Sequence, residues 1–195
     1  MSKFLTISFV IIALIVGMGV GFVISPQYAL LNNNMNEHTS DLGVADKQYD
    51  LRFINAMIAH HMGAIDMAKN AKDNSKRGEI KTLVNNIISA QQKEIDQMYS
   101  WKKDWYNDTS KVEMNDYSMN VNLGTSDSKY DLRFINAMIA HHDMAIEMAT
   151  DAQRKSTRNE ILNLANDVIT AQTSEISNMN TWRENWYGIK ADMNQ

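Results

Sequence analysis

An internal duplication with a period of 81 residues constrains this 195-residue chain more than any other feature. Residues 49–106 align with residues 130–187 without a gap, and 33 of the 58 paired positions are identical. The block from Tyr49 to His61 recurs letter for letter as Tyr130 to His142. The chain is therefore predicted to consist of two equivalent structural units.

Each copy has the apolar period of two amphipathic helices. In the first copy one stripe runs from Phe53 to Ala68, and a second, longer stripe runs from Ile80 to Trp105. The stripes are interrupted at residues 73–75, and in the second copy at residues 155–157, which predicts one helical hairpin per copy. A single proline and only eight glycines also favour an all-α fold.

A lone amphipathic hairpin cannot cover its own apolar stripe, so the two hairpins are expected to pack together. We predict an all-α protein in which two tandem helical hairpins form one four-helix bundle. Pairing of hairpins between two chains, which would give a homodimer, is the competing arrangement.

The N-terminal segment is predicted to insert into a membrane. Residues 4–24 contain no charged side chain, and at about 1.5 Å per residue such a helix spans the hydrocarbon core of a bilayer. Lys3 precedes this run and the next lysine is Lys47, so the positive-inside rule exports the rest of the chain. We expect a transmembrane helix that anchors the protein, with its bulk in the periplasm or at the cell surface. A cleaved signal segment and a secreted protein are the alternative.

These features divide the chain into six segments. An anchor or signal segment spans residues 1–28, and a polar linker spans residues 29–48. The two hairpins and the pieces around them are the first hairpin 49–106, a linker 107–129, the second hairpin 130–187 and a tail 188–195.

Charge and cysteine content narrow the function. The formal charge is −4, and no cluster of lysine and arginine provides the positive patch that nucleic-acid binding needs. The chain has no cysteine, which excludes disulfides and thiolate ligands. Any metal ligands must be histidine, methionine, carboxylate or amide.

Polar side chains interrupt the buried stripes at the same positions in both copies. Each first helix carries an adjacent histidine pair beside the centre of its apolar face: His60, His61, His141 and His142. Each second helix carries glutamine, glutamate and methionine on its stripe, and these six residues are further candidate metal ligands: Gln91, Glu94, Met98, Gln172, Glu175 and Met179. Because a buried unpaired imidazole or carboxylate costs on the order of several kcal/mol, these groups need a hydrogen-bond network, ion pairs or a metal.

Two aspartates, and a few positions at which the copies differ, also have predicted places on the first helices. Asp50 and Asp131 come just before the apolar period begins, so we expect them to cap the first helices rather than to bind metal. Met62-Gly63 in the first copy is replaced by Asp143-Met144 in the second, and Asp66 becomes Glu147. These positions are expected to project to the outer half of the helix, so both inner sites are expected to survive.

Methionine is abundant, with 14 residues in the chain. Methionines at helical spacing usually fill cores, yet thioether and imidazole together form the ligand set that suits Cu(I). The methionines nearest the histidine pairs are Met57, Met67, Met138 and Met148. A second group in the polar linkers is expected to be exposed and to capture metal weakly: Met35 beside His38, Met114 and Met119.

These patterns resemble the family labelled domain of unknown function 305. The resemblance covers both copies and rests on Asp50-x-x-Phe53-x-x-x-Met57-Ile58-x-His60-His61 followed by Gln91-x-x-Glu94-Ile95-x-x-Met98-x-x-Trp101. It implies a ferritin-like four-helix fold and export from the cytoplasm. Some members look like copper-binding proteins linked to copper resistance, and the resemblance carries their histidine and methionine ligands onto His60, His61, Met57, Met67, His141, His142, Met138 and Met148.

The leading interpretation is a protein that captures or buffers copper outside the cytoplasm, with Cu(I) favoured and another transition metal as the alternative. A metal-exchange protein would be its partner, and no catalytic turnover is implied. A ferritin-like di-metal oxidase is disfavoured, because such sites use Glu-x-x-His pairs and none occurs here. A structural or sensory envelope bundle with a buried polar network is the remaining alternative.

Overall fold

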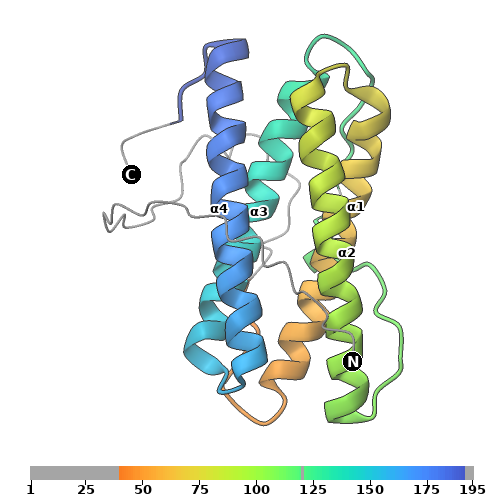
Figure 1. Cartoon of the computed structure of the whole chain (residues 1–195), viewed down its shortest axis with the longest axis vertical. Helices are drawn as coiled ribbons and strands as arrows, with labels where there is room; N and C mark the ends of the chain where they lie inside the picture. The colour runs from red at the N-terminus through yellow and green to blue at the C-terminus, as the bar shows by residue number, and fades with distance from the viewer. Residues whose placement is uncertain (1–39, 120, 192–195) are drawn as a thin grey trace, which may run out of the picture.

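The chain folds into an antiparallel four-helix bundle, which the computed structural model describes for residues 40–119 and 121–191 (Figure 1). Helices α1 (Tyr49–Asn74) and α2 (Gly78–Tyr106) form the first hairpin, and α3 (Tyr130–Lys155) and α4 (Asn159–Tyr187) form the second. A short 3-10 helix, η2 (Asp116–Ser118), lies between them. Across these residues there is no strand. The prediction of an all-α four-helix bundle is therefore confirmed, and both hairpins come from one chain.

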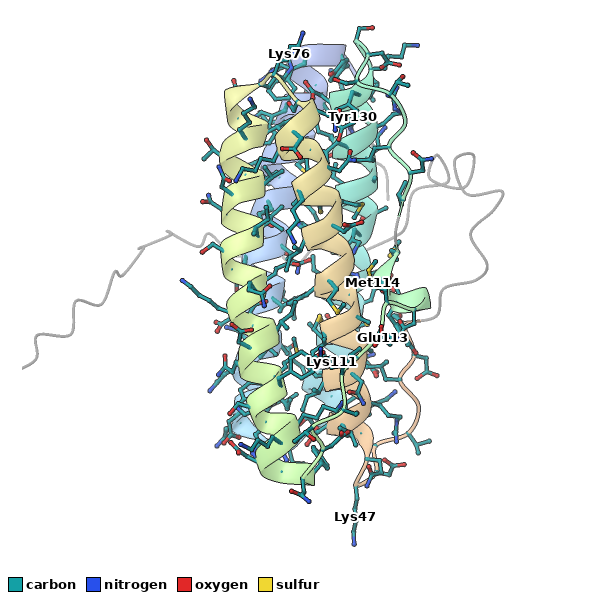
Figure 2. All side chains as sticks on the ribbon, turned by 90° about the vertical axis from the view of Figure 1, so that its right-hand side faces the viewer. Lys47, Lys76, Lys111, Glu113, Met114 and Tyr130 are labelled. Carbon is teal, nitrogen blue, oxygen red and sulfur yellow. The ribbon has the colours of Figure 1, made fainter. Side chains whose placement is uncertain are left out.

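An approximate twofold axis relates the two hairpins, because the contacts between them occur in equivalent pairs. Tyr49 donates its hydroxyl to Asp151 at 2.9 Å, and the equivalent Tyr130 donates to Asn70. The loop arginines follow the same rule: Arg77 pairs with Asp131 at 3.3 Å, and Arg158 with Asp50 at 3.2 Å. The loop of each hairpin thus lies beside the start of the other hairpin, as Figure 2 shows for Lys76 and Tyr130.

The core consists of two apolar clusters, one toward each end of the bundle. One cluster joins the first half of α1 to the second half of α3, and includes Met57 and Ala149. The other joins the complementary halves, and includes Ala68 and Phe134. The four histidines belong to neither cluster and lie near the middle of α1 and α3. The bundle therefore has apolar ends and a polar layer at its centre.

Each first helix is preceded by the same structured turn, which extends the repeat upstream. Leu42 and Leu123 are buried, and the glycines that follow them have φ of 84° and 70°. Arg52 donates from Nε to the carbonyl oxygen of Leu42 at 2.7 Å, and Arg133 donates to that of Leu123 at the same distance. The end of each predicted linker thus belongs to the repeat unit, and the sequence signals it only by the shared Leu-Gly-x-x-Asp.

Asp50 and Asp131 do not cap the first helices, so that prediction is wrong. The N-cap residues are Gln48 and Lys129, and neither makes a side-chain capping hydrogen bond. Each aspartate is the second residue of its helix and pairs with the loop arginine of the other hairpin. A carboxylate in a first turn also interacts favourably with the helix dipole. These residues therefore fasten the two hairpins together.

The linker between the repeats crosses α1 and breaks the symmetry of the bundle. Lys102, at the end of α2, is buried and donates from Nζ to the carbonyl oxygen of Ser110 at 2.8 Å. Farther along, η2 packs on Gly63 so closely that a Cβ there would lie 1.7 Å from the carbonyl oxygen of Ser118. Figure 2 shows this segment passing along α1 near Met114. Only a residue without a side chain fits beneath the linker.

Two predictions about outward-facing residues are wrong in part. Asp66 and Glu147 are exposed as expected, but Gly63 and its equivalent Met144 are buried and Asp143 is half-buried, so these three do not lie on the outer half of the helix. Met119 was expected to be exposed but is buried, with a left-handed φ of 44°, whereas Met114 is exposed. The linker is packed against the bundle because buried side chains along it hold it there.

The predicted membrane anchor, residues 1–28, lies outside the described residues, as do Met35 and His38. Within the described ranges, none of the helices is long and apolar enough to cross a bilayer.

We expect Gly63→Ala to lower the free energy of unfolding by roughly 1–3 kcal/mol, because the added Cβ forces the linker away from α1. Urea denaturation of the full chain measures this change. The matched control is Gly78→Ala, where a Cβ meets nothing within 4 Å. That substitution should raise stability by up to about 1 kcal/mol, because it restricts the unfolded chain. Equal effects of the two substitutions would contradict the tight packing of η2 on α1.

Candidate metal centre

The histidine layer, formed by His60, His61, His141 and His142, lies where α1 meets α3. His60 and its equivalent His141 face each other, with ring centroids 3.7 Å apart and ring planes inclined at 49°. A residue that contacts its own repeat equivalent must lie on the twofold axis. Both side chains are buried, with exposures of 0% and 1%. The axis of the bundle therefore passes between two buried imidazoles.

The second histidine of each pair turns toward its own hairpin. His61 Nε2 lies 2.6 Å from Glu94 Oε2 on α2, and His142 Nε2 lies 2.7 Å from Glu175 Oε2 on α4. Both imidazoles are fully buried, whereas the glutamate side chains are 23% and 21% exposed. Each carboxylate thus joins a buried ring to the surface of the bundle.

The carboxylates determine which ring nitrogen is available to a ligand. A neutral imidazole has one N–H donor and one nitrogen lone pair. With the Nε2 proton donated to the glutamate, the lone pair lies on Nδ1. The Nδ1 atoms of His61 and His142 are buried and have no hydrogen-bond partner in the described part of the chain. A histidine held by a carboxylate through one nitrogen, with the other left open, has the arrangement that metal-ligating histidines adopt.

The two axial histidines are neutral. Burial lowers the pKa of His60 and of His141 well below the usual value of 6.5, and repulsion from the neighbouring histidines lowers it further. Nearby backbone groups of His141 and Ser118 act in the opposite direction but more weakly. Neutral imidazole is the form that binds metal ions. None of the ring nitrogens of these two residues has a hydrogen-bond partner within the described ranges.

Two glutamines add further unpaired atoms to the layer. Gln91 and Gln172 lie one turn before the glutamates and are only 4% and 3% exposed. Their Oε1 atoms also have no partner among the residues described. A buried polar atom left without a partner costs about 1–3 kcal/mol. A group this large therefore calls for an occupant, either water or a metal ion.

The six methionines predicted as ligands all lie in the core, each at most 2% exposed: Met57, Met67, Met98, Met138, Met148 and Met179. Met57 precedes His60 by three residues, and Met138 precedes His141 by three. Helical register therefore places each methionine on the same face of its helix as that histidine. Met67 packs in the cluster that holds the start of α3, and Met148 in the cluster that holds the start of α1. Methionine therefore lies in the apolar core on both sides of the histidine layer.

The described residues contain no group of three or more histidine, aspartate and glutamate side chains arranged to hold a metal ion. Imidazole and carboxylate alone thus do not form a ready-made site there. An ion at the layer would have to take thioether or amide ligands together with imidazole, and of these two combinations thioether with imidazole is the one typical of soft ions such as Cu(I).

Sequence reasoning did not place two features beside the layer. The backbone of Ser118, in η2, interacts with His141, so the linker closes one side of the layer. Burial, together with Glu147 one turn away, raises the pKa of Asp143 to about 6. The linker has no periodicity that could have revealed its contact. Asp143 could have been found, because it introduces a carboxylate where the first copy has Met62.

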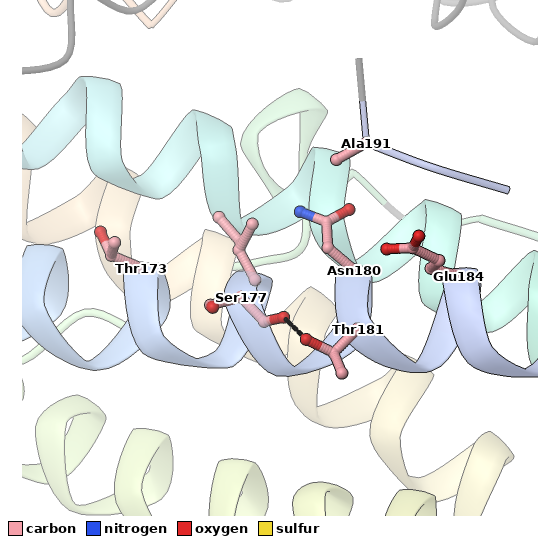
Figure 3. A pocket seen from close by; sticks show the side chains of 7 residues that line it. Thr173, Ser177, Asn180, Thr181, Glu184 and Ala191 are labelled. Atoms are coloured by element: carbon pink, nitrogen blue, oxygen red, sulfur yellow. Dashed lines mark hydrogen bonds between the residues drawn. The ribbon is translucent and has the colours of Figure 1, made fainter. Parts of the chain in front are cut away.

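Two hollows open on the described surface, and they differ in their relation to the layer. The larger, about 380 Å³, lies on α4 beneath Ala191 and is lined by small polar side chains such as Thr173 and Ser177 (Figure 3). Its lining contains no histidine or methionine. The smaller, about 180 Å³, lies between α2 and α4, and Glu94 forms part of its wall. This second hollow therefore reaches the candidate centre.

Comparison with known proteins assigns the repeat to a family. The family model described as domain of unknown function (DUF305) matches residues 50–129 and again residues 131–195. The chain belongs to this family. Both DUF305 matches begin within the first turn of a hairpin and extend beyond its second helix. A search of curated proteins gives no match.

Solved structures share the fold. CopM in the Cu(II)-bound form is 35% identical, with a TM-score of 0.64, and the match covers 71% of this chain and 97% of that chain. CopM in the Cu(I)-bound form is 36% identical, with a TM-score of 0.62 and coverage of 71% and 98%. A DUF305 fragment from Deinococcus radiodurans is 23% identical, with a TM-score of 0.59 and coverage of 70% and 95%. The last of these shows likeness in fold alone.

The free energy of unfolding of the metal-free chain should fall as the pH drops below about 6.5. The unfolded chain binds protons on His60 and His141 near that pH, whereas their pKa values in the folded chain are lower, so acid favours the unfolded state. Each histidine contributes at most about 1.4 kcal/mol per pH unit. Denaturant titrations from about pH 7.5 to about pH 5, the range in which histidine gains its proton, measure this slope. The variant His60→Gln with His141→Gln should give a flatter profile, and an equally steep one would show that other groups are responsible.

Proposed function

We propose that this protein binds copper outside the cytoplasm, as a capture, buffering or resistance protein, and that the histidine layer is its metal centre. The observation that carries the proposal is the state of His61 and His142. Each has Nε2 fixed by a glutamate and a buried Nδ1 without a partner within the described residues. A carboxylate that holds the other ring nitrogen of a ligating histidine orients the ring and increases its basicity.

The donor set favours Cu(I) over other transition metals. Neutral imidazoles from His60 and His141 and thioethers from Met57 and Met138 are soft or borderline donors, and the chain offers no thiolate. Zinc sites usually combine four imidazole, thiolate or carboxylate ligands, and no such group occurs in the described part. CopM, at 35–36% identity, is known in Cu(II)-, Cu(I)- and silver-bound forms, which supports the same class of metal here.

Localisation and partners form a further part of this proposal. The uncharged run at residues 4–24 would anchor the bundle to a membrane, with the bundle in the periplasm or at the cell surface. The bundle would be ferritin-like in class but without that fold's di-metal chemistry. Because the hairpins cover each other within one chain, metal binding needs no homodimer, and the partner would be a protein that exchanges metal with this one.

A Cu(I) titration of the full chain against a colorimetric chelator tests the metal centre. We expect tight binding that weakens by more than about 100-fold when His60, His61, His141 and His142 are all changed to Ala. The milder pair Glu94→Gln and Glu175→Gln should weaken binding about 10- to 100-fold while keeping the size of every side chain. Circular dichroism reports whether each variant remains helical.

The matched control is Met114→Leu, which removes an exposed thioether of the linker. It should leave the affinity unchanged. Absence of Cu(I) binding by the wild type would overturn the proposed function. Undiminished binding by the histidine and glutamate variants would place the metal elsewhere in the chain.

A second titration isolates the thioethers. Met57→Leu with Met138→Leu keeps the buried volume, so the free energy of unfolding should change by less than about 1.5 kcal/mol per site. Loss of sulfur donors should nevertheless weaken Cu(I) binding roughly tenfold, or about 1.4 kcal/mol. Denaturation and chelator competition on the same samples separate packing from ligation. An unchanged Cu(I) affinity would exclude these two methionines as ligands.

A structural role for the layer is the second candidate function. The His61–Glu94 and His142–Glu175 hydrogen bonds would then serve to fix the register of the helices, as buried polar networks do in some proteins. The two roles differ in one measurement. Under the structural role the histidine variants lose stability while the wild type shows no affinity for Cu(I).

A further inference from the structure

A groove between α2 and α4 borders the first half of the histidine layer, His60 and His61, because Glu94, the partner of His61, forms part of its wall. Its volume is about 180 Å³. From α2 it is lined by Glu94, Gln97 and Trp101, and from α4 by Glu160, Asn163, Leu164 and Asp167. Three of these seven side chains are carboxylates. Within the described residues, neither Glu160 nor Asp167 forms an ion pair.

The groove is connected to the candidate centre through Glu94. This residue lines the groove, keeps 23% of its side chain exposed, and lies 2.6 Å from the fully buried His61. Behind it, His61 Nδ1 and Gln91 Oε1 are buried atoms without a partner in the described part of the chain. An ion that reaches Glu94 from the groove is therefore one side chain away from the layer.

The carboxylates are not equally distributed between the two copies. The repeat equivalents of Glu94 and Glu160 are Glu175 and Glu79, so two acidic groups are present on both sides. The equivalent of Asp167, however, is Asn86. The groove beside His60 and His61 thus has one more negative charge than the corresponding positions beside His141 and His142.

We propose that this groove is the route by which Cu(I) reaches the first half of the histidine layer, and that Asp167 makes this half load faster than the second. The inference rests on the proposed function. Negative charges at the mouth of a cleft raise the local concentration of cations and their rate of arrival. Carboxylates bind Cu(I) weakly, so they attract the ion without retaining it, and imidazole and thioether lie beyond. Trp101 adds an aromatic face, which also favours a cation.

The test uses the full chain and silver(I) nitrate in chloride-free buffer, since Ag(I) mimics Cu(I) without redox chemistry. Silver uptake after rapid mixing is followed in two ways. Tryptophan fluorescence reports on the groove, because Trp101 lines it. Competition with a silver-binding indicator is the second readout. Asp167→Asn should slow the faster phase about threefold at low ionic strength. Asn86→Asp should speed the slower phase by a similar factor. Both effects should vanish at about 1 M salt, where the screening length is about 3 Å.

Asp96→Asn is the control, because it removes an exposed carboxylate of α2 that does not line the groove. It should leave both phases unchanged. The equilibrium affinity should also be the same in all three variants, because charge at the mouth speeds arrival and departure alike. Equal slowing by Asp96→Asn, or wild-type rates in Asp167→Asn and Asn86→Asp, would overturn the route but leave the metal centre intact. No silver binding by the wild type would overturn both.

Discussion

The contact between His60 and His141 is the constraint on which the rest of the bundle depends. These residues are repeat equivalents, and their rings lie 3.7 Å apart at the centre of the molecule. Two like residues can meet in this way only on a twofold axis, so the contact fixes how the second hairpin is placed on the first. It also prevents both imidazoles from being charged at once, since two charged rings at that distance would repel strongly, and burial keeps each of them neutral. The apolar clusters on either side bury the two rings and maintain that neutrality. The twofold arrangement of the hairpins, the burial of the two rings and their neutral state thus depend on one another.

The linker opposes this symmetry. It must carry the chain from the end of α2 to the start of α3, at the opposite end of the bundle, and only one such connection exists (Figure 1). Lys102 holds its beginning and Gly63 receives η2, and the equivalent positions are Arg183 and Met144. A duplicated gene therefore produces two hairpins whose surroundings cannot be identical. The copies differ at Gly63, where the linker touches α1, whereas the four histidines of the layer and the glutamates beside them, Glu94 and Glu175, are the same in both.

Much of this arrangement could be predicted from the sequence. The periodic stripes identified all four helices, and the predicted break at residues 73–75 lies within two residues of the observed loop, because apolar period and interruption are local properties. The inward direction of the histidine pairs followed from the same register. Partner choice did not, because nothing local distinguishes an imidazole that faces α3 from one that faces Glu94. The seat of η2 on Gly63 was missed for a similar reason, since a linker without periodicity carries no signal of what it covers. Asp50 was misread as a cap because its ion pair with Arg158 exists only after the hairpins dock.

An adjacent pair, rather than two histidines one turn apart, is what this geometry requires. Side chains one turn apart point in the same direction, so both would face the same neighbouring helix. Consecutive residues diverge by about 100° around the helix. His60 can therefore face α3 across the axis while His61 faces α2 within its own hairpin. One dipeptide thus brings three helices to a single layer, and its repetition in α3 brings in the fourth through Glu175. If either histidine of a pair moved by one turn, the layer would keep its composition but separate into two levels along the bundle.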